Sequence, residues 1–220
     1  MNALTNAFKI ITPSGDEYHS LEDWGLAMGN NNYIGDPTLE EFYVDVPGGP
    51  VLDLSQALTK RPVFKQREIH IEVGGVRDRF DWDGEISTIR NLIDGQVCKI
   101  IFDNDSNWYW KGRVRITDFD REASIGHFTI TMLADAYKYA VIAESDTYTT
   151  ETAVITFPNF DIPVVPEFEC TAGCDLSDGT EVYHLRVGKN RIPTLKTDTS
   201  KTWTLTGNTS TTVTCREMSL

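Results

Sequence analysis

The chain has 220 residues, enough for one large domain or two small ones that each bury a core. Its 33 acidic and 20 basic side chains give a formal net charge of −13, which argues against a nucleic-acid binder because such proteins need a basic surface. The fractions of hydrophobic residues (40%) and charged residues (24%) are typical of a packed globular chain. No run approaches the ~18 apolar residues of a membrane span. Met1–Lys9 lacks the pattern of a secretory signal, so we expect synthesis in a cytosol.

An acidic segment lies near the start of the chain. Residues 10–59 carry nine acidic side chains and neither lysine nor arginine. Glycine and proline interrupt residues 25–65 and hydrophobic periodicity is weak there, which predicts a long connection of the kind that usually has a function. A solvated loop is the commoner interpretation, and a surface that repels polyanions is the alternative. The nine acids are Asp16, Glu17, Glu22, Asp23, Asp36, Glu40, Glu41, Asp45 and Asp53.

Strands dominate the middle of the chain. Alternation of apolar and polar residues predicts half-buried strands over residues 68–73, 113–117 and 127–132. Residues 97–102 predict another strand, followed by a turn over residues 103–107, because Asp and Asn side chains hydrogen-bond their own backbone in turns. The chain then continues into Trp108–Trp110, which completes a hairpin.

One amphipathic helix is predicted among these strands. Its apolar stripe consists of Ile86, Ile89, Leu92 and Ile93. Asp83 is placed to cap the helix, and Gly95 is placed to end it. A single helix among strands covers a sheet face or an open end of the sheet.

Three consecutive aromatic residues, Trp108, Tyr109 and Trp110, pose a packing problem. Adjacent strand residues point to opposite faces, so one side of a sheet cannot bury all three. Either both faces are covered or an aromatic side chain contacts a partner. Burial within the chain is the favoured interpretation, because aromatic residues mostly belong to cores.

Composition changes near residue 140. Residues 1–139 contain 8 threonines, whereas the shorter stretch 140–220 contains 17. Threonine at this density favours strands. We therefore predict two domains, 1–139 and 140–220, with the polar segment Ala143–Thr147 as a connector, and a small antiparallel sandwich in the second domain. Its expected strands are Thr152–Phe157, Val164–Thr171, Glu181–Val187, Arg191–Leu195, Thr202–Thr206 and Thr211–Arg216.

Four cysteines, Cys98, Cys170, Cys174 and Cys215, are too few for a disulfide scaffold. Cys170 and Cys174 have C-x3-C spacing, which fits no paired zinc knuckle, so apolar strand cysteines are the favoured interpretation. A bridge between two of the three C-terminal cysteines is an option in an oxidising medium, but the sequence leaves the pairing open.

No catalytic or metal-binding motif is complete in this sequence. His70-Ile71-Glu72 has the H-x-E of zinc deaminases, but no P-C-x-x-C follows it. Residues 103–114 begin like a calcium loop but place Trp108 at its glycine position and Val114 at its glutamate position. We predict a protein without catalytic residues, metal site or cofactor.

Several motifs, in order, resemble the distal tail proteins of siphophages. Residues 49–68 resemble the stretch G-x-x-L-D-L-(S/T)-x-A-L-T-G-R-P-x-(Y/F)-x-x-R of that family, with Lys60 in place of the glycine before Arg61. Five further stretches follow in the family's order, with Met218 in place of a glycine. They are the end of the helix at residues 91–95, Trp108–Val114, Ile162–Pro166, Arg186–Asn190 and the terminal residues 216–220. The resemblance covers nearly the whole chain.

The resemblance implies a mainly β structural protein of the virion. The expected fold is a tail-tube-like β-sandwich with one α-helix, followed by a small galectin-like antiparallel β-sandwich. The first domains of such proteins assemble as a six-fold ring at the phage tail tip. That ring joins the tail tube protein to the hub or adhesion protein and leaves a lumen for the tape-measure protein and then DNA, which passes without specific binding. No catalytic residue, cofactor or membrane contact is implied.

A closed ring of identical subunits needs head-to-tail contacts, which a long arm reaching the next subunit supplies. The segment 36–62 is our candidate arm, and acidic walls would keep DNA from adhering to a conduit. We therefore predict that some of the nine acids face the lumen. The candidate inter-subunit contacts are Asp36, Pro37, Leu39, Phe42, Tyr43, Arg61, Trp108 and Trp110.

Two other classes compete with the ring. A carbohydrate-binding module would need an exposed aromatic platform, for which residues 165–220 offer only Phe168, Tyr183 and Trp203. An enzyme would have to hold a metal in the acidic cluster.

Overall fold

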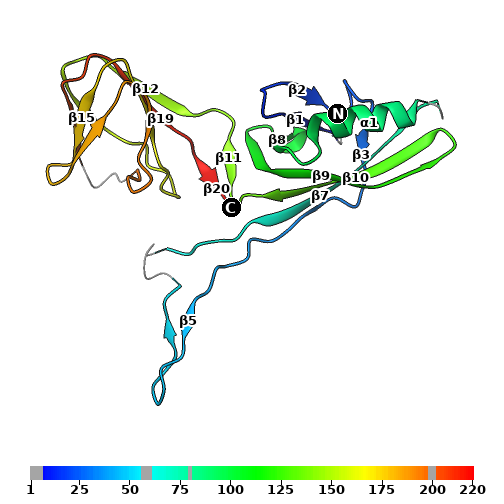
Figure 1. Ribbon diagram of the computed structural model, residues 1–220, viewed down its shortest axis with the longest axis horizontal. Helices are drawn as coiled ribbons and strands as arrows, with labels where there is room; N and C mark the ends of the chain where they lie inside the picture. Colours follow the sequence, from blue (N-terminus) through cyan, green and yellow to red (C-terminus); the bar gives the residue numbers. More distant parts are fainter. Residues whose placement is uncertain (1–6, 56–60, 79–80, 198–201) are drawn as a thin grey trace. The chain divides into compact units, whose positions relative to one another are not determined.

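A computed structural model describes residues 7–55, 61–78, 81–197 and 202–220. The chain divides into two compact units, residues 1–138 with Leu220 and residues 139–219. Within the described ranges the chain forms one α-helix and many antiparallel strands, so the predicted mainly β class is confirmed (Figure 1). The same ranges contain no helix with the length and hydropathy needed to cross a lipid bilayer.

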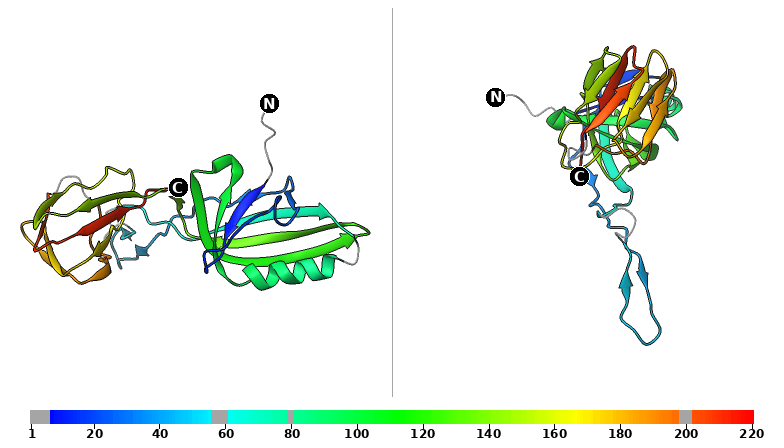
Figure 2. Two further views of the ribbon diagram at one scale, coloured as in Figure 1. Left: turned by 90° about the horizontal axis from the view of Figure 1, so that it is seen from above. Right: turned by 90° about the vertical axis from the view of Figure 1, so that its left-hand side faces the viewer.

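The first unit is built on one antiparallel sheet whose strand order is β2-β1-β8-β9-β10-β7-β3, with β4 also paired to β7 (Figures 1 and 2). The strand bounds are β1 Phe8–Ile11, β2 Glu17–His19, β3 Ala27–Met28, β4 Tyr33–Ile34, β7 Arg67–Val76, β8 Val97–Phe102, β9 Trp108–Glu122 and β10 Ile125–Ala134. The predicted strands near residues 70, 100, 115 and 130 are confirmed. A short 3-10 helix, η1 Asp103–Asp105, makes the predicted turn between β8 and β9.

The helix α1, Trp82–Ile93, covers one face of this sheet (Figure 2). It buries Trp82 and the isoleucines of the predicted stripe against the strands. Asp81 rather than Asp83 is the N-cap, and Asp83 lies in the first turn, where its charge still complements the helix dipole. Gly95 follows the helix with φ +76°, a conformation that favours glycine, as predicted.

The aromatic triplet at the start of β9 is largely covered on both faces. Tyr109 and Trp110 are buried, and Trp108 is half-buried. Each ring has a cation nearby: Lys138 lies over Trp108, Lys99 over Tyr109 and Arg67 over Trp110. Burial within the chain is therefore confirmed for Tyr109 and Trp110. Trp110 is 6% exposed, so it offers little surface to a neighbouring subunit.

The second unit contains two four-stranded antiparallel sheets that enclose a separate core. One sheet has the order β12-β19-β14-β17 and the other β13-β18-β15-β16. Phe168, Leu176 and Leu205 are fully buried between them. The strand bounds are β12 Glu144–Tyr148, β13 Thr152–Ile155, β14 Glu167–Cys170, β15 Cys174–Ser177, β16 Val182–Leu185, β17 Gly188–Arg191, β18 Trp203–Thr206 and β19 Thr211–Cys215. Two further short strands, β11 Lys138–Ala140 and β20 Met218–Ser219, pair with each other outside these two sheets.

Two sequence predictions for this unit were wrong, and one strand was missed. The supposed connector Ala143–Thr147 lies almost wholly within β12, and the strand expected over Arg191–Leu195 is instead β17, which ends at Arg191. Strand β15 was not predicted at all. β12 is an edge strand with almost no buried side chain, so it lacks the alternation by which strands are recognised.

Candidate protein interface

The candidate functional site is a hairpin within the acidic segment. Strands β5 Tyr43–Val44 and β6 Leu52–Asp53 pair only with each other, forming a two-stranded sheet separate from the main sheet (Figure 1). Its turn is closed by the Gly49 amide, which donates to the Val46 carbonyl oxygen at 2.9 Å, and Gly48 has φ +75°, which favours glycine. The ladder continues beyond the strands because the Leu54 amide donates to the Phe42 carbonyl oxygen at 2.8 Å.

One face of the hairpin is apolar and exposed. Strand alternation places Phe42, Val44, Leu52 and Leu54 on the same side. Phe42 is 59% exposed, Leu52 47% and Leu54 40%. An isolated two-stranded hairpin is marginally stable in water, and clustered exposed apolar side chains mark interaction sites. This face is therefore suited to bind a protein surface.

The opposite face is acidic around Tyr43. Glu41 and Asp53 raise the pKa of the Tyr43 hydroxyl, because a phenolate beside carboxylates is repelled. The Ser55 hydroxyl and amide donate hydrogen bonds to Asp53, which lower the pKa of that carboxyl and keep it ionised. The hairpin thus presents an apolar side and an anionic side, with the two exposed aromatic residues Phe42 and Tyr43 on opposite sides.

The nine acids of the sequence prediction are all exposed, but they form two groups. Asp16, Glu17, Glu22 and Asp23 lie in and just after the β1–β2 hairpin, where Glu17 pairs with Lys9 at 2.9 Å. The other five, Asp36, Glu40, Glu41, Asp45 and Asp53, belong to the β5–β6 hairpin and the chain leading to it.

The remaining predicted contact residues lie mostly at the base of the hairpin. Leu39 forms an isolated bridge with Phe64, and both Pro37 and Leu39 are half-buried. The Glu40 amide donates to the Val63 carbonyl oxygen at 2.7 Å. These contacts join the segment that enters the hairpin to the segment that leaves it. Arg61 is exposed, and Trp108 is half-buried in the first unit.

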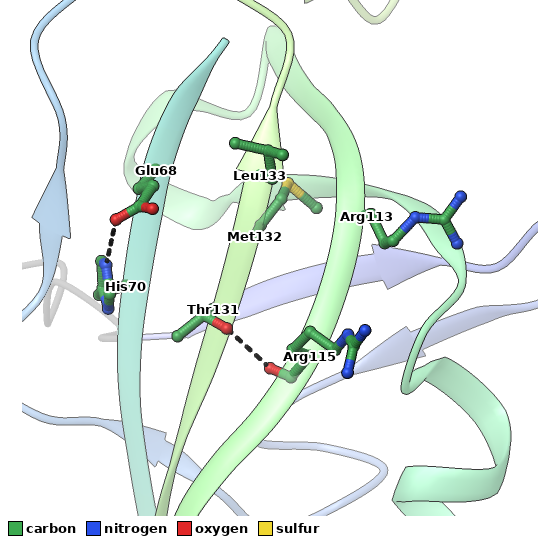
Figure 3. A pocket seen from close by; sticks show the side chains of 7 residues that line it. All are labelled: Glu68, His70, Arg113, Arg115, Thr131, Met132 and Leu133. Atoms are coloured by element: carbon green, nitrogen blue, oxygen red, sulfur yellow. Dashed lines mark hydrogen bonds and ion pairs between the residues drawn. The ribbon is translucent and has the colours of Figure 1, made fainter.

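Sequence reasoning missed a groove of about 380 Å³ on the exposed face of strands β7, β10 and β9 (Figure 3). Arg113 and Arg115 lie along one side, and Glu68 lies 3.4 Å from His70 along the other. The groove is lined by Glu68, His70, Arg113, Arg115, Thr131, Met132 and Leu133. The alternation of bases over residues 111–115 was the available signal, but it was used only to predict a strand.

Within the described ranges, no three His, Cys, Asp or Glu side chains lie close enough together to hold a metal ion. In residues 139–197 and 202–219 no Phe, Tyr or Trp side chain is exposed; Phe168 and Trp203 are buried and Tyr183 is half-buried. The aromatic platform on which the carbohydrate-binding alternative depended is therefore not formed by these residues.

The fold described above is shared with a solved structure over nearly its whole length. The solved structure of SPP1 Dit (gp 19.1), whose published description calls it a paradigm of the hub adsorption apparatus in phages that infect Gram-positive bacteria, matches 97% of this chain and 99% of its own. The TM-score is 0.56 and the sequence identity is 14%, so the match establishes the shared fold. No protein-family model matches the chain, and a search of the curated proteins finds no match.

Proposed function

We propose that this chain is a non-enzymatic structural protein of a phage tail tip. The proposal is supported by the Dit-like fold over 97% of the chain and by the order of family motifs in the sequence. In this role the protein joins the tail tube protein to a hub or adhesion protein. Its location is the virion, after synthesis in the host cytoplasm.

The observation that carries the proposal is the exposed apolar face of the β5–β6 hairpin. Phe42, Leu52 and Leu54 lie together on it and are each at least 40% exposed. Full burial of such a side chain contributes about 1.5–3 kcal/mol relative to full exposure, so covering this face favours association. A hairpin that docks on a different surface of the next copy makes a head-to-tail contact, which closes into a ring when the rotation between copies allows it.

The anionic side of the same hairpin suits the predicted lumen. Tyr43, Glu41 and Asp53 lie on the side away from Phe42, so one element is able to contact a neighbour and still present carboxylates to solvent. Carboxylates along a passage repel the phosphates of DNA. The ring, its six-fold symmetry and the passage of the tape-measure protein and DNA are parts of this proposal.

The test compares two neighbouring aromatic residues in the purified full chain. Phe42→Ser removes an aromatic side chain from the apolar face, and Tyr43→Ser removes one from the acidic face. Native mass spectrometry of the wild-type protein over a range of concentrations should show a closed oligomer. Phe42→Ser should shift it towards monomer, and Tyr43→Ser should retain the oligomer.

Two results would count against the proposal. A wild-type chain that stays monomeric at every concentration and is absent from purified virions would exclude the ring. Equal losses of oligomer in both variants, with unchanged circular dichroism, would show that the apolar face is not the specific contact.

A further inference from the structure

Two cysteine side chains of the second unit are in contact. The Sγ atoms of Cys170 and Cys174 lie 3.8 Å apart, and the two residues are only 2% and 6% exposed. Cys170 is the last residue of β14, and Cys174 is the first residue of β15. These strands belong to the two different sheets of the unit, so the thiols meet where the chain crosses from one sheet to the other.

Strand alternation and a short connection bring these two thiols together. Cys170 follows the inward-facing Phe168 by two residues, and Cys174 precedes the inward-facing Leu176 by two, so both thiols point into the shared core. Only residues 171–173 separate the cysteines, and the Thr171 amide is held by a hydrogen bond to the Ser210 carbonyl oxygen at 3.0 Å. The sequence left open which two of the three C-terminal cysteines could be bridged, and the structure places Cys170 and Cys174 in contact.

The groups around the two sulfurs also hold them in place. The Asn190 side-chain amide donates towards the Cys170 Sγ at 3.8 Å, and the Thr211 hydroxyl lies 3.7 Å from the Cys174 Sγ. Thr211 is itself fully buried and donates to the Asn208 side-chain oxygen at 2.7 Å. Cys98 belongs to the core of the first unit and Cys215 lies on β19.

We propose that Cys170 and Cys174 are a modification site, at which a small-molecule disulfide oxidises the two thiols to an intramolecular disulfide that joins the two sheets. One thiolate attacks a sulfur of the oxidant, forms a mixed disulfide and releases one thiolate of the oxidant. The second cysteine thiolate then attacks the protein sulfur of the mixed disulfide and releases the second. The cysteines lose two electrons and two protons in total, and the oxidant becomes two thiols.

Geometry and burial set the expected behaviour. A disulfide needs sulfur atoms about 2.05 Å apart, so the thiols must approach by less than 2 Å, which side-chain rotation supplies more readily than movement of a strand. Burial raises the pKa of the Cys170 thiol, and a protonated, enclosed thiol reacts slowly. Oxidation should therefore be slow in the native protein and faster in a low urea concentration that opens the unit transiently.

The experiment incubates the reduced full chain with oxidised glutathione, then denatures it, blocks free thiols with N-ethylmaleimide and digests it with trypsin. The sequence makes the products easy to distinguish, because Cys170 and Cys174 share one tryptic peptide, residues 139–186. Cys98 lies in residues 91–99 and Cys215 in residues 202–216. The expected product is the 139–186 peptide with both alkyl groups missing and a mass 2 Da below that of its dithiol form.

Matched variants complete the test. Cys170→Ala and Cys174→Ala should each abolish the closed peptide, whereas Cys215→Ala should leave it unchanged, and the oxidised wild type should melt at a higher temperature than the reduced form. A peptide 139–186 linked to 202–216, a stable glutathione adduct on one cysteine, or four alkylated cysteines after incubation in low urea would each overturn the proposal. The chemistry does not depend on the proposed ring, so failure here leaves the native mass spectrometry result standing, and the reverse also holds.

Discussion

The guanidinium carbon of Arg67 lies 4.8 Å from the centre of the Trp110 ring, and its Nη2 atom donates to the Ala136 carbonyl oxygen at 2.5 Å. Arg67 is only 7% exposed, and burial lowers the pKa of its guanidinium. A buried cation is tolerated because the ring face and the carbonyl replace part of its hydration. Arg67 begins β7, at the point where the chain returns from the hairpin to the main sheet.

Replacing Arg67 with alanine should destabilise the protein by about 2–3 kcal/mol, because the charge-assisted hydrogen bond and the stacking on Trp110 are both lost. Urea unfolding followed by circular dichroism measures the change. Arg115→Ala on the exposed sheet face is the control and should change stability by less than about 0.5 kcal/mol. Equal effects of the two substitutions would refute the assigned role of Arg67.

Gly126 and Gly84 should respond oppositely to alanine. A Cβ atom at Gly126 would lie 2.5 Å from the Trp82 ring, whereas one at Gly84 would meet open space. Gly126→Ala forces the ring out of the core and should cost about 1–3 kcal/mol. Gly84→Ala removes a helix glycine and should stabilise by about 0.5–1 kcal/mol. Thermal unfolding of both variants tests the packing of α1, and a Gly126→Ala protein as stable as the wild type would contradict it.

Asn208 should hold the edge strand β12 in place. It is buried, and its side-chain amide donates to the carbonyl oxygens of Tyr148 and Thr150, each at 2.9 Å. Asn208→Ala leaves these acceptors and the Thr211 hydroxyl without their partner, at a cost of about 2–3 kcal/mol.

Hydrogen exchange followed by mass spectrometry gives a local test of the Asn208 prediction. Protection should fall in β12 and β19 and stay unchanged in α1. The exposed residue Asn159 supplies the control, since Asn159→Ala should leave exchange unaltered. Loss of protection spread evenly over both units would instead indicate general destabilisation.

Stability of the reduced protein should fall as the pH rises above 9. Burial raises the pKa of Cys98 to about 11 and that of Cys215 to about 12, against 9.0 without burial. The unfolded chain releases these protons first, so between pH 9 and the folded-state pKa it binds fewer protons than the native state does. Stability then declines by about 1.4 kcal/mol per pH unit for each thiol.

The measurement is the slope of the unfolding free energy against pH, compared between the variant and the wild type. The comparison is needed because other groups also titrate in this range. Cys215→Ala should reduce that slope between pH 9 and 11 under reducing conditions. A slope identical to the wild type would mean that the Cys215 thiolate is already accommodated in the folded state.

Prediction from the sequence was most accurate for strands and helices with one buried face, because burial imposes a regular spacing of apolar residues. In β10 the residues Phe128, Ile130 and Met132 are buried, and the helix stripe was recognised because isoleucines recur at its spacing. Strand β12 was missed because its side chains are polar and bury almost nothing. Its cross-strand side-chain contacts to β19 are made by hydroxyl groups, such as those of Thr147 and Thr212, 3.0 Å apart. Alternation reports burial, so a strand held by polar contacts at a sheet edge gives no such signal.

Part of the candidate interface was also recognisable from sequence. The absence of lysine and arginine from residues 10–59 and the frequent glycine and proline residues identified the segment. The grouping of Phe42 with Leu52 and Leu54 on one face depends on the hairpin register, in which Tyr43 pairs with Asp53 and Val44 with Leu52. Composition carries no register, and a shift by one residue would place Val51 and Asp53, instead of Leu52 and Leu54, on the same face as Phe42.

Residues 36–55 carry five carboxylates and no base. Each chain has a net charge of −13, so bringing copies together also brings like charges together, and that mutual repulsion opposes assembly. Dissolved ions screen it, with a Debye length of about 30 Å at 0.01 M and about 8 Å at 0.15 M. Raising the ionic strength should therefore promote association of this protein, the reverse of its usual effect on contacts made between opposite charges.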